Sequence, residues 1–270
     1  MSAIETRRVL RLQSPDRPPE FGDDTVAAES AVHITINGIH CLTIMCTPER
    51  LHDLVTGHLL SEGIIDRPDQ LTDIRILDKY KCEATLAAEL DLQERLGLAT
   101  PFLRIVTTGC GTGPSSPFVK LMDRLVPLKV EGKMLFDASA IQGAASGLNR
   151  EALIYRGTGG VHAASICARD GTLEHLAEDV GRHNAVDKAI GSCARAGCSF
   201  EERFLMSTGR LTGDMILKAA RVKIPVVASI SALITSGIDV AKKCGVTAIG
   251  FVRGRRMNIY CHPERIRVSS

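Results

Sequence analysis

The sequence predicts an α/β protein built on a layered mixed sheet with helices on both faces. Beyond Asp137, short apolar β-prone runs alternate with stretches of helical spacing, which is typical of layered α/β sheets. The helical stretches begin near Arg182, Leu211 and Ile234, and the β-prone runs read VHAASICA, FLMS, IPVVASI and AIGFV. Loops at the carboxyl ends of strands usually build the binding site of such a sheet, and several loops here are polar and rich in glycine.

A smaller α+β part is predicted ahead of this sheet. Two β-prone runs within residues 31–47 flank Asn37 and Gly38, a pair that favours a two-residue hairpin turn. Thr47 and Pro48 read as an N-cap and a first helical residue, and Gly63 ends the predicted helix. Strand-like segments follow between residues 74 and 90.

These patterns divide the chain into three parts. Residues 1–30 are rich in charge and proline without a sustained period, so we expect a flexible arm. Residues 31–101 form the amino-terminal α+β part. A transition near Pro101 begins the α/β domain over residues 102–270.

Composition limits the classes of function. A formal charge of +2 over 270 residues is too small for a general nucleic-acid or membrane-surface binder. The longest apolar run, residues 224–238, is interrupted by hydroxyl residues and is too short to span a membrane. The charged amino terminus lacks the pattern of a secretory signal, and nine irregularly spaced cysteines favour reduced thiols. We therefore expect a cytoplasmic protein.

Cys110 is the candidate reactive cysteine. Gly109, Gly111 and Gly113 surround it in a predicted strand-to-helix loop, where no bulky neighbour would shield the sulfur. Backbone N–H groups in such a loop can stabilise a thiolate or a persulfide. The alternative is a small residue in a tight turn.

Two further segments contain candidate binding residues. In GTGGVHA, His162 lies at the start of a buried strand behind a glycine loop, although a histidine satisfied in the core is an equal alternative. In EDVGRHNAVDK, Arg182, His183 and Asn184 fall at a helix start, where N–H groups favour anions. A capped helix with surface ion pairs is the alternative there.

The segment FVRGRR is the best phosphate site in the sequence. It consists of Phe251, Val252, Arg253, Gly254, Arg255 and Arg256 and follows a buried strand. Guanidinium groups match phosphate oxygens in bidentate geometry. A solvated basic turn is the alternative.

The sequence predicts no metal site. It contains no CxxC pair, and the nearest spacings, Cys41 to Cys46 and Cys193 to Cys198, have no histidine at a ligand-like offset. A zinc-dependent deaminase is disfavoured because the combined zinc signature, HxE followed by PCxxC, is missing.

Taken in order, five segments resemble the FdhD/NarQ family of formate dehydrogenase accessory sulfurtransferases. They are GTGGVHAA, EDVGRHNAVDK, STGRLTGDMILKAA, SISA and GFVRGRRMNIY, and the resemblance extends over residues 103–263. It implies a core similar to the cytidine-deaminase fold. A homodimer is compatible with the family.

The resemblance also implies a function. Members accept sulfur from a cysteine desulfurase as a persulfide and pass it to the molybdenum bis(molybdopterin guanine dinucleotide) cofactor for formate dehydrogenase. By this resemblance Cys110 would carry the persulfide, and residues 251–256 would hold the guanine nucleotide of the cofactor. His162, Arg182, His183 and Asn184 would line the pocket.

One departure from the family pattern leaves a second function open. Members commonly show a Cys-Gly-x-Cys-Gly loop, whereas this chain has one cysteine in residues 109–113. The alternative is a chaperone that binds and delivers the cofactor without transferring sulfur.

Overall fold

The computed structural model describes most of the chain. Cys110 and the boundary expected near Pro101 lie outside the described residues, which are 2–12, 14, 16–78, 80–95, 128–132 and 134–268.

The main sheet has six strands in the order β13-β12-β11-β10-β8-β9. The three central strands β10, β11 and β12 are parallel, while β8, β9 and β13 pair in antiparallel fashion. The predicted mixed sheet is therefore confirmed. The strands are β8 (His162–Cys167), β9 (Leu173–Asp179), β10 (Phe204–Ser207), β11 (Val226–Ser229), β12 (Thr247–Arg253) and β13 (Arg256–Cys261).

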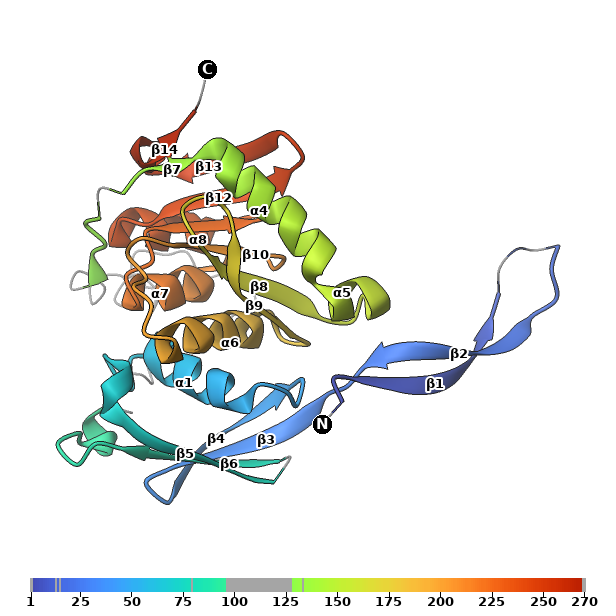
Figure 1. Cartoon of the computed structure of the whole chain (residues 1–270), viewed down its shortest axis with the longest axis horizontal. Helices are drawn as coiled ribbons and strands as arrows, with labels where there is room; N and C mark the ends of the chain where they lie inside the picture. The colour runs from blue at the N-terminus through green and yellow to red at the C-terminus, as the bar shows by residue number, and fades with distance from the viewer. Residues whose placement is uncertain are drawn as a thin grey trace.

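Helices cover both faces of this sheet, as predicted (Figure 1). One face packs against α4 (Ala138–Glu151), which α5 (Leu153–Thr158) continues. The other face packs against α6 (Arg182–Arg195), α7 (Gly213–Arg221) and α8 (Thr235–Cys244). The alternation of side chains along each strand explains the two cores: Phe204 and Met206 face α4, whereas Leu205 belongs to the core on the α6 side.

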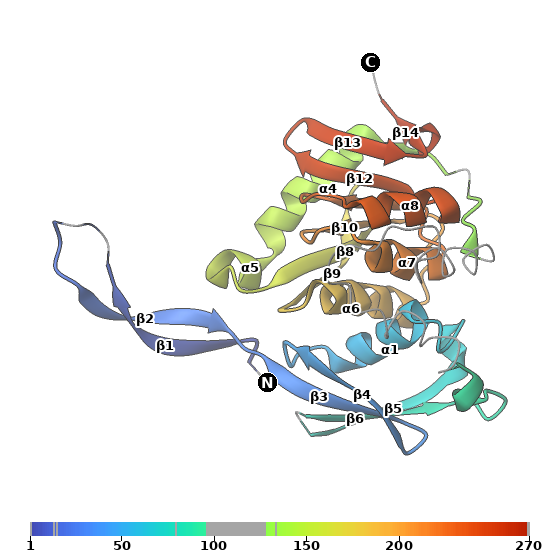
Figure 2. The ribbon, with the colours of Figure 1, turned by 180° about the vertical axis from the view of Figure 1, so that it is seen from behind.

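The smaller α+β part adds two more layers on the α6 side. Helix α1 (Leu51–Ser61) lies against α6, and a four-stranded sheet in the order β4-β3-β6-β5 covers the far side of α1 (Figures 1 and 2). One continuous core joins that sheet, α1 and the helices α6 to α8. The strands are β3 (Ser30–Ile36), β4 (Ile39–Cys46), β5 (Leu71–Asp78) and β6 (Lys81–Leu86).

The predicted hairpin is confirmed, and the start of the predicted helix is corrected. Asn37 and Gly38 both have positive φ angles, 50° and 77°, as a turn between β3 and β4 requires. Helix α1 begins at Leu51, not directly after Thr47. Thr47 does not cap it, because its backbone N–H and its hydroxyl bind Asp179 and Val180 of the main domain.

The first thirty residues contain regular structure where the sequence predicted only a flexible arm. Strands β1 (Ile4–Arg11) and β2 (Glu20–Ala27) pair along their whole length as an antiparallel ribbon. Both views show this ribbon projecting away from the two sheets (Figures 1 and 2). Most residues of its strands are exposed and none is fully buried, so the sequence has no alternating apolar pattern that would reveal them.

Short elements complete the described chain: β7 (Phe136–Asp137) pairs with β14 (Ile266–Arg267), and 3₁₀ turns occur at Pro68–Gln70 and Pro263–Arg265. No described helix combines the length and the apolar composition that crossing a membrane requires.

Candidate functional site

Strand register brings the predicted site segments to one edge of the main sheet. The first residue of β8, His162, is paired with the last residue of β9, Asp179. The last residues of the parallel strands β10 and β11, Ser207 and Ser229, are also paired with each other. The edge therefore collects the loops that follow β9, β10, β11 and β12, as expected for the carboxyl ends of parallel strands.

Serine hydroxyls hold two of these loops in place. Ser207 Oγ accepts a hydrogen bond from Gly209 N, and Ser229 Oγ donates one of 2.7 Å to the Gly209 carbonyl. Both serines are buried, so these bonds also satisfy polar groups that have lost contact with water. These bonds hold the backbone of the loop after β10 in a fixed position at the sheet edge.

The segment at residues 178–188 divides into an inner and an outer half. Asp179 and Lys188 form a fully buried ion pair of 2.6 Å, and Lys188 also donates to the Thr47 carbonyl. Asn184 donates to Asp179 and to the Met45 carbonyl. These three side chains attach α6 to the smaller part, whereas Arg182 and His183 lie at the sheet edge.

His183 forms a hydrogen bond with Asp214 at the start of α7. Its Nε2 lies 2.7 Å from Asp214 Oδ2, and the Thr212 hydroxyl donates to the other carboxylate oxygen. Burial acts to raise the pKa of Asp214, but the hydrogen bond and charge of His183 hold that pKa well below its usual range. Asp214 is therefore ionised and fixes the orientation of the imidazole.

His162 is a half-buried imidazole next to this pair. Its Nδ1 lies 3.2 Å from the Thr208 hydroxyl, which also accepts a bond from Ala163 N. Burial, together with the positive charge of Arg182, lowers the pKa of His162. At neutral pH this ring is therefore neutral and can accept or donate a hydrogen bond.

Arg182 has an unused donor. Its Nε is buried without a hydrogen-bond partner among the described residues. Gly209 packs directly on the Arg182 side chain, so close that a Cβ there would lie 2.9 Å from Arg182 Cβ. A buried guanidinium N–H in this position suits an anionic ligand.

The arginine turn, residues 251–256, comprises the end of β12, the two turn residues 254–255 and the first residue of β13, and lies at the same edge. Phe251 has a positive φ of 54° and donates its N–H to the Ser231 carbonyl, which links this turn to the loop after β11. Arg253 Nε donates to the Ile230 carbonyl, and the guanidinium carbons of Arg253 and Arg256 lie 5.7 and 5.9 Å from the centre of the Phe251 ring. The turn thus presents exposed arginine side chains from a fixed backbone.

The structure brings together most of the predicted site residues and separates one. His162, Arg182 and His183 lie close to one another, and hydrogen bonds between loops connect them to residues 251–256. Asn184 is buried and directed at β4, so it supports the site without facing it. Val252 is also buried. The placement of Cys110 lies outside the described residues.

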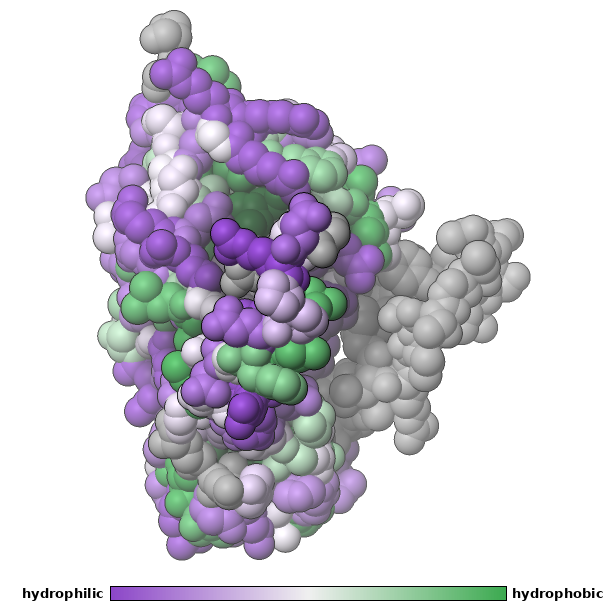
Figure 3. Space-filling view, turned by 90° about the vertical axis from the view of Figure 1, so that its right-hand side faces the viewer, coloured by the Kyte–Doolittle hydropathy of each residue, from purple (hydrophilic) through white to green (hydrophobic). Residues whose placement is uncertain are grey.

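Sequence reasoning missed Thr208 and the pairing of Asp214 with His183. Thr208 and Asp214 both lie in STGRLTGDM, a polar segment that also contributes to the family resemblance but in which the sequence singled out no site residue. Figure 3 looks at the side toward which the β1–β2 ribbon projects and shows a hollow with hydrophobic residues at its floor and hydrophilic ones around it.

The fold and these residues define an α/β protein with a cationic, histidine-containing site at the carboxyl edge of its main sheet. The chain belongs to the FdhD/NarQ family, whose model matches residues 27–267. The family resemblance seen in the sequence is therefore confirmed.

Relatives and a solved structure are similar over almost the whole chain. A protein named sulfur carrier protein FdhD from Methanothermobacter thermautotrophicus is 35% identical over 90% of this chain and 92% of its own. One of the same name from Shouchella clausii is 33% identical over 98% of this chain and 97% of its own. A crystal structure described as a formate dehydrogenase accessory protein from Desulfotalea psychrophila has a TM-score of 0.77 and 23% identity, covering 98% of this chain and 100% of that one. This last likeness supports the fold.

Proposed function

We propose that this protein is a sulfur carrier that takes sulfur from a cysteine desulfurase and delivers it to the molybdenum bis(molybdopterin guanine dinucleotide) cofactor of formate dehydrogenase. Membership of a family whose relatives are named sulfur carrier proteins is the observation on which the proposal rests. The cofactor is cargo here, not a resident group. All eight described cysteines are free thiols, as expected for a protein that functions in the reducing cytoplasm.

Cys110 is the proposed carrier. Its thiolate would attack the outer sulfur of the desulfurase persulfide, so that one S–S bond breaks as another forms and the desulfurase cysteine leaves as a thiolate. Burial raises the pKa of most of the described thiols, to about 12 for Cys46, Cys167 and Cys193 and to about 11 for Cys82 and Cys244. Such thiols hold little thiolate at neutral pH and are poor sulfur acceptors.

The sheet-edge site is proposed to hold the cofactor. Arg253, Arg255 and Arg256 are exposed and form no ion pair with a described acidic residue, so their charges are available to nucleotide phosphates. The unused Nε of Arg182 and the neutral ring of His162 supply further hydrogen bonds. The chain's own residues thus bind and orient an anionic ligand.

The proposal is tested by intact mass after incubation with a cysteine desulfurase and cysteine. We expect the wild type to gain one sulfur atom per chain and Cys110→Ala to gain none. Cys198→Ser, which changes a partly exposed cysteine elsewhere, is the matched control and should keep the adduct. An adduct that survives in Cys110→Ala would show that Cys110 is not the carrier.

The second candidate, a chaperone that delivers the cofactor without transferring sulfur, is favoured by the single cysteine of the 109–113 loop. It predicts that no variant, nor the wild type, gains sulfur, while guanine nucleotide still binds. Restoration of formate dehydrogenase activity in cells that lack this protein would then be independent of Cys110.

Nucleotide binding should depend on the arginine turn whether the protein is a sulfur carrier or a chaperone. We expect the double change Arg255→Ala with Arg256→Ala to weaken GDP binding by about tenfold or more, because two charged hydrogen-bond donors are lost. Arg169→Ala is the control, since Arg169 is equally exposed in the turn that joins β8 to β9 at the opposite end of the sheet. Calorimetric titration measures the difference, and equal affinities in both variants would exclude this turn from the nucleotide site.

A further inference from the structure

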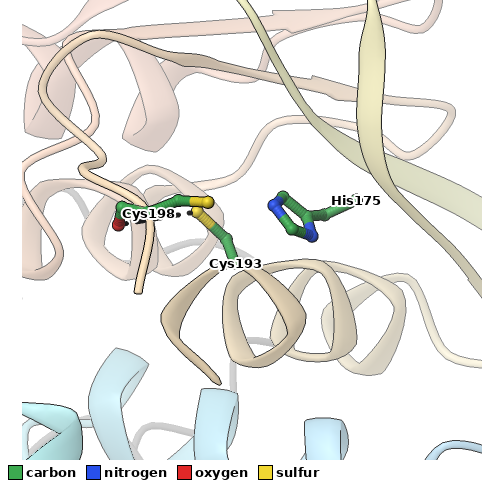
Figure 4. Close-up of side chains that lie close together, drawn as sticks. All are labelled: His175, Cys193 and Cys198. Carbon is green, nitrogen blue, oxygen red and sulfur yellow. Dashed lines mark hydrogen bonds between the residues drawn. The ribbon is translucent and has the colours of Figure 1, made fainter. Parts of the chain in front are cut away.

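A cluster of one histidine and two cysteines lies at the end of α6 that is remote from the sheet-edge site. Ligand atoms of His175, Cys193 and Cys198 lie within 4.8 Å of one another, and they form the one such group found among the described residues (Figure 4). Cys193 follows Arg182 by eleven residues on the same helix, which corresponds to about 16 Å along its axis.

The two cysteines meet because of the way α6 ends. Gly197 has a positive φ of 70° and donates its N–H to Ala194 O, while Cys198 N donates to Cys193 O. These bonds are those of a glycine-terminated helix, in which the chain reverses over the last turn. The reversal returns Cys198 to Cys193, five residues earlier.

The histidine comes from the neighbouring strand. His175 lies on β9, on the face against which α6 packs, and its ring points toward the two sulfur atoms (Figure 4). Ser192 Oγ lies 3.0 Å from His175 Nδ1. This bond orients the ring and leaves Nε2 for a metal, which is the usual arrangement around a ligating histidine. The sequence predicted no metal here because this histidine precedes Cys193 by 18 residues and is supplied only by the fold.

The geometry points to a zinc site formed by His175, Cys193 and Cys198, with a fourth position open to water. Tetrahedral zinc with bonds of about 2.0–2.3 Å separates its ligand atoms by roughly 3.5–3.8 Å. The observed cluster therefore needs only a contraction of about 1 Å, within reach of side-chain rotation. His175 and Cys198 are partly exposed, which provides a path for the ion and for the water.

Charge balance favours the dipositive ion. Binding would release one proton from each thiol, and two thiolates with Zn²⁺ leave no net charge beside the fully buried Cys193. Arg203 is the nearby cation, and Glu174 pairs with it at 2.5 Å, so its repulsion of the ion is offset. This site is independent of the proposed sulfur transfer.

The test titrates metal-stripped, reduced full-length protein with Zn²⁺ against a chromogenic chelator. Wild type and Cys41→Ser, a change of another partly exposed cysteine, should each bind one equivalent. Cys198→Ser and His175→Asn should lose at least about 100-fold in affinity, because loss of a second-shell partner alone costs up to that factor. Co²⁺ in place of zinc should give the thiolate-to-cobalt absorption band in the wild type and lose it in Cys198→Ser.

Thermal unfolding with and without Zn²⁺ checks that the variants are folded. Zinc should raise the Tm of the wild type by about 5 °C or more at high saturation and leave Cys198→Ser unchanged. Failure of the wild type to bind zinc, or equal affinity in all variants, would overturn the site. So would zinc binding that is lost in Cys110→Ala, because the ion would then lie elsewhere.

Discussion

Gly57→Ala is expected to destabilise the protein by at least about 3 kcal/mol. Gly57 lies on α1 where that helix crosses α6, and a Cβ at this position would lie 1.7 Å from the Asp187 carbonyl oxygen. The partner position is equally tight, since a Cβ at Gly191 would lie 1.9 Å from the Asp53 carbonyl oxygen. The two helices would have to move apart, and the core that joins the smaller part to the main domain would open with them.

Gly143→Ala is the matched control for this change. Gly143 is an exposed residue within α4, and a Cβ there would meet nothing within 4 Å. Alanine should stabilise this helix by about 0.5–1 kcal/mol because it restricts the unfolded chain. Urea unfolding measures the free energy of unfolding of both variants. If Gly57→Ala lost no more stability than the error of the measurement, α1 and α6 would not cross as closely as described.

The contrast between these glycines shows what local sequence can predict. The sequence predicted β8, β10, β11, β12 and the helices α6 to α8, because buried β runs and amphipathic helices have a local period, but it did not identify β9, α4 or α5. Gly57 and Gly143 both lie in helices, however, and only the packing of α1 on α6 distinguishes them. Contacts between segments far apart in the chain leave no local period.

The part of the candidate site that lies at the carboxyl ends of strands was predictable from the sequence. Residues 182–183 and 251–256 were expected to meet because carboxyl ends of parallel strands share an edge, and the structure places them there. The buried role of Asn184 was not predictable, because it depends on β4, about 140 residues earlier, packing on α6. For the same reason, the sequence does not show that His175 lies next to Cys193.

Lys218→Met is expected to cost about 3–5 kcal/mol of stability at neutral pH. Lys218 is buried between α1, α6 and α7, where its Nζ lies 2.9 and 3.0 Å from the two carboxylate oxygens of Asp187 and 2.7 Å from Glu62. Methionine fills a similar volume but leaves the fully buried Asp187 carboxylate without its main counter-charge. Ser61 and His58 still donate to Asp187, and Arg221 still pairs with Glu62.

The double change Lys218→Met with Asp187→Asn separates packing from charge. Asparagine keeps the shape of the side chain and removes the buried negative charge, so the double variant should be more stable than Lys218→Met alone. If the double variant were less stable by the sum of the two single effects, packing and not the unpaired charge would explain the loss.

The charge of Asp187 also predicts how the stability cost of Lys218→Met changes with pH. Burial acts to raise the pKa of Asp187, but the charge of Lys218 and the hydrogen bond from His58 hold that pKa below its usual range. A carboxylate with a depressed pKa stabilises the fold above its unfolded pKa of about 3.9, and this contribution is lost as the pH falls through the folded value. In Lys218→Met burial is less opposed, so protonation of Asp187 at mildly acidic pH relieves the unpaired charge. Urea unfolding of both proteins at pH 7 and near pH 4 should therefore show a smaller difference in stability at the lower pH, whereas a constant difference would exclude the Asp187 charge as its cause.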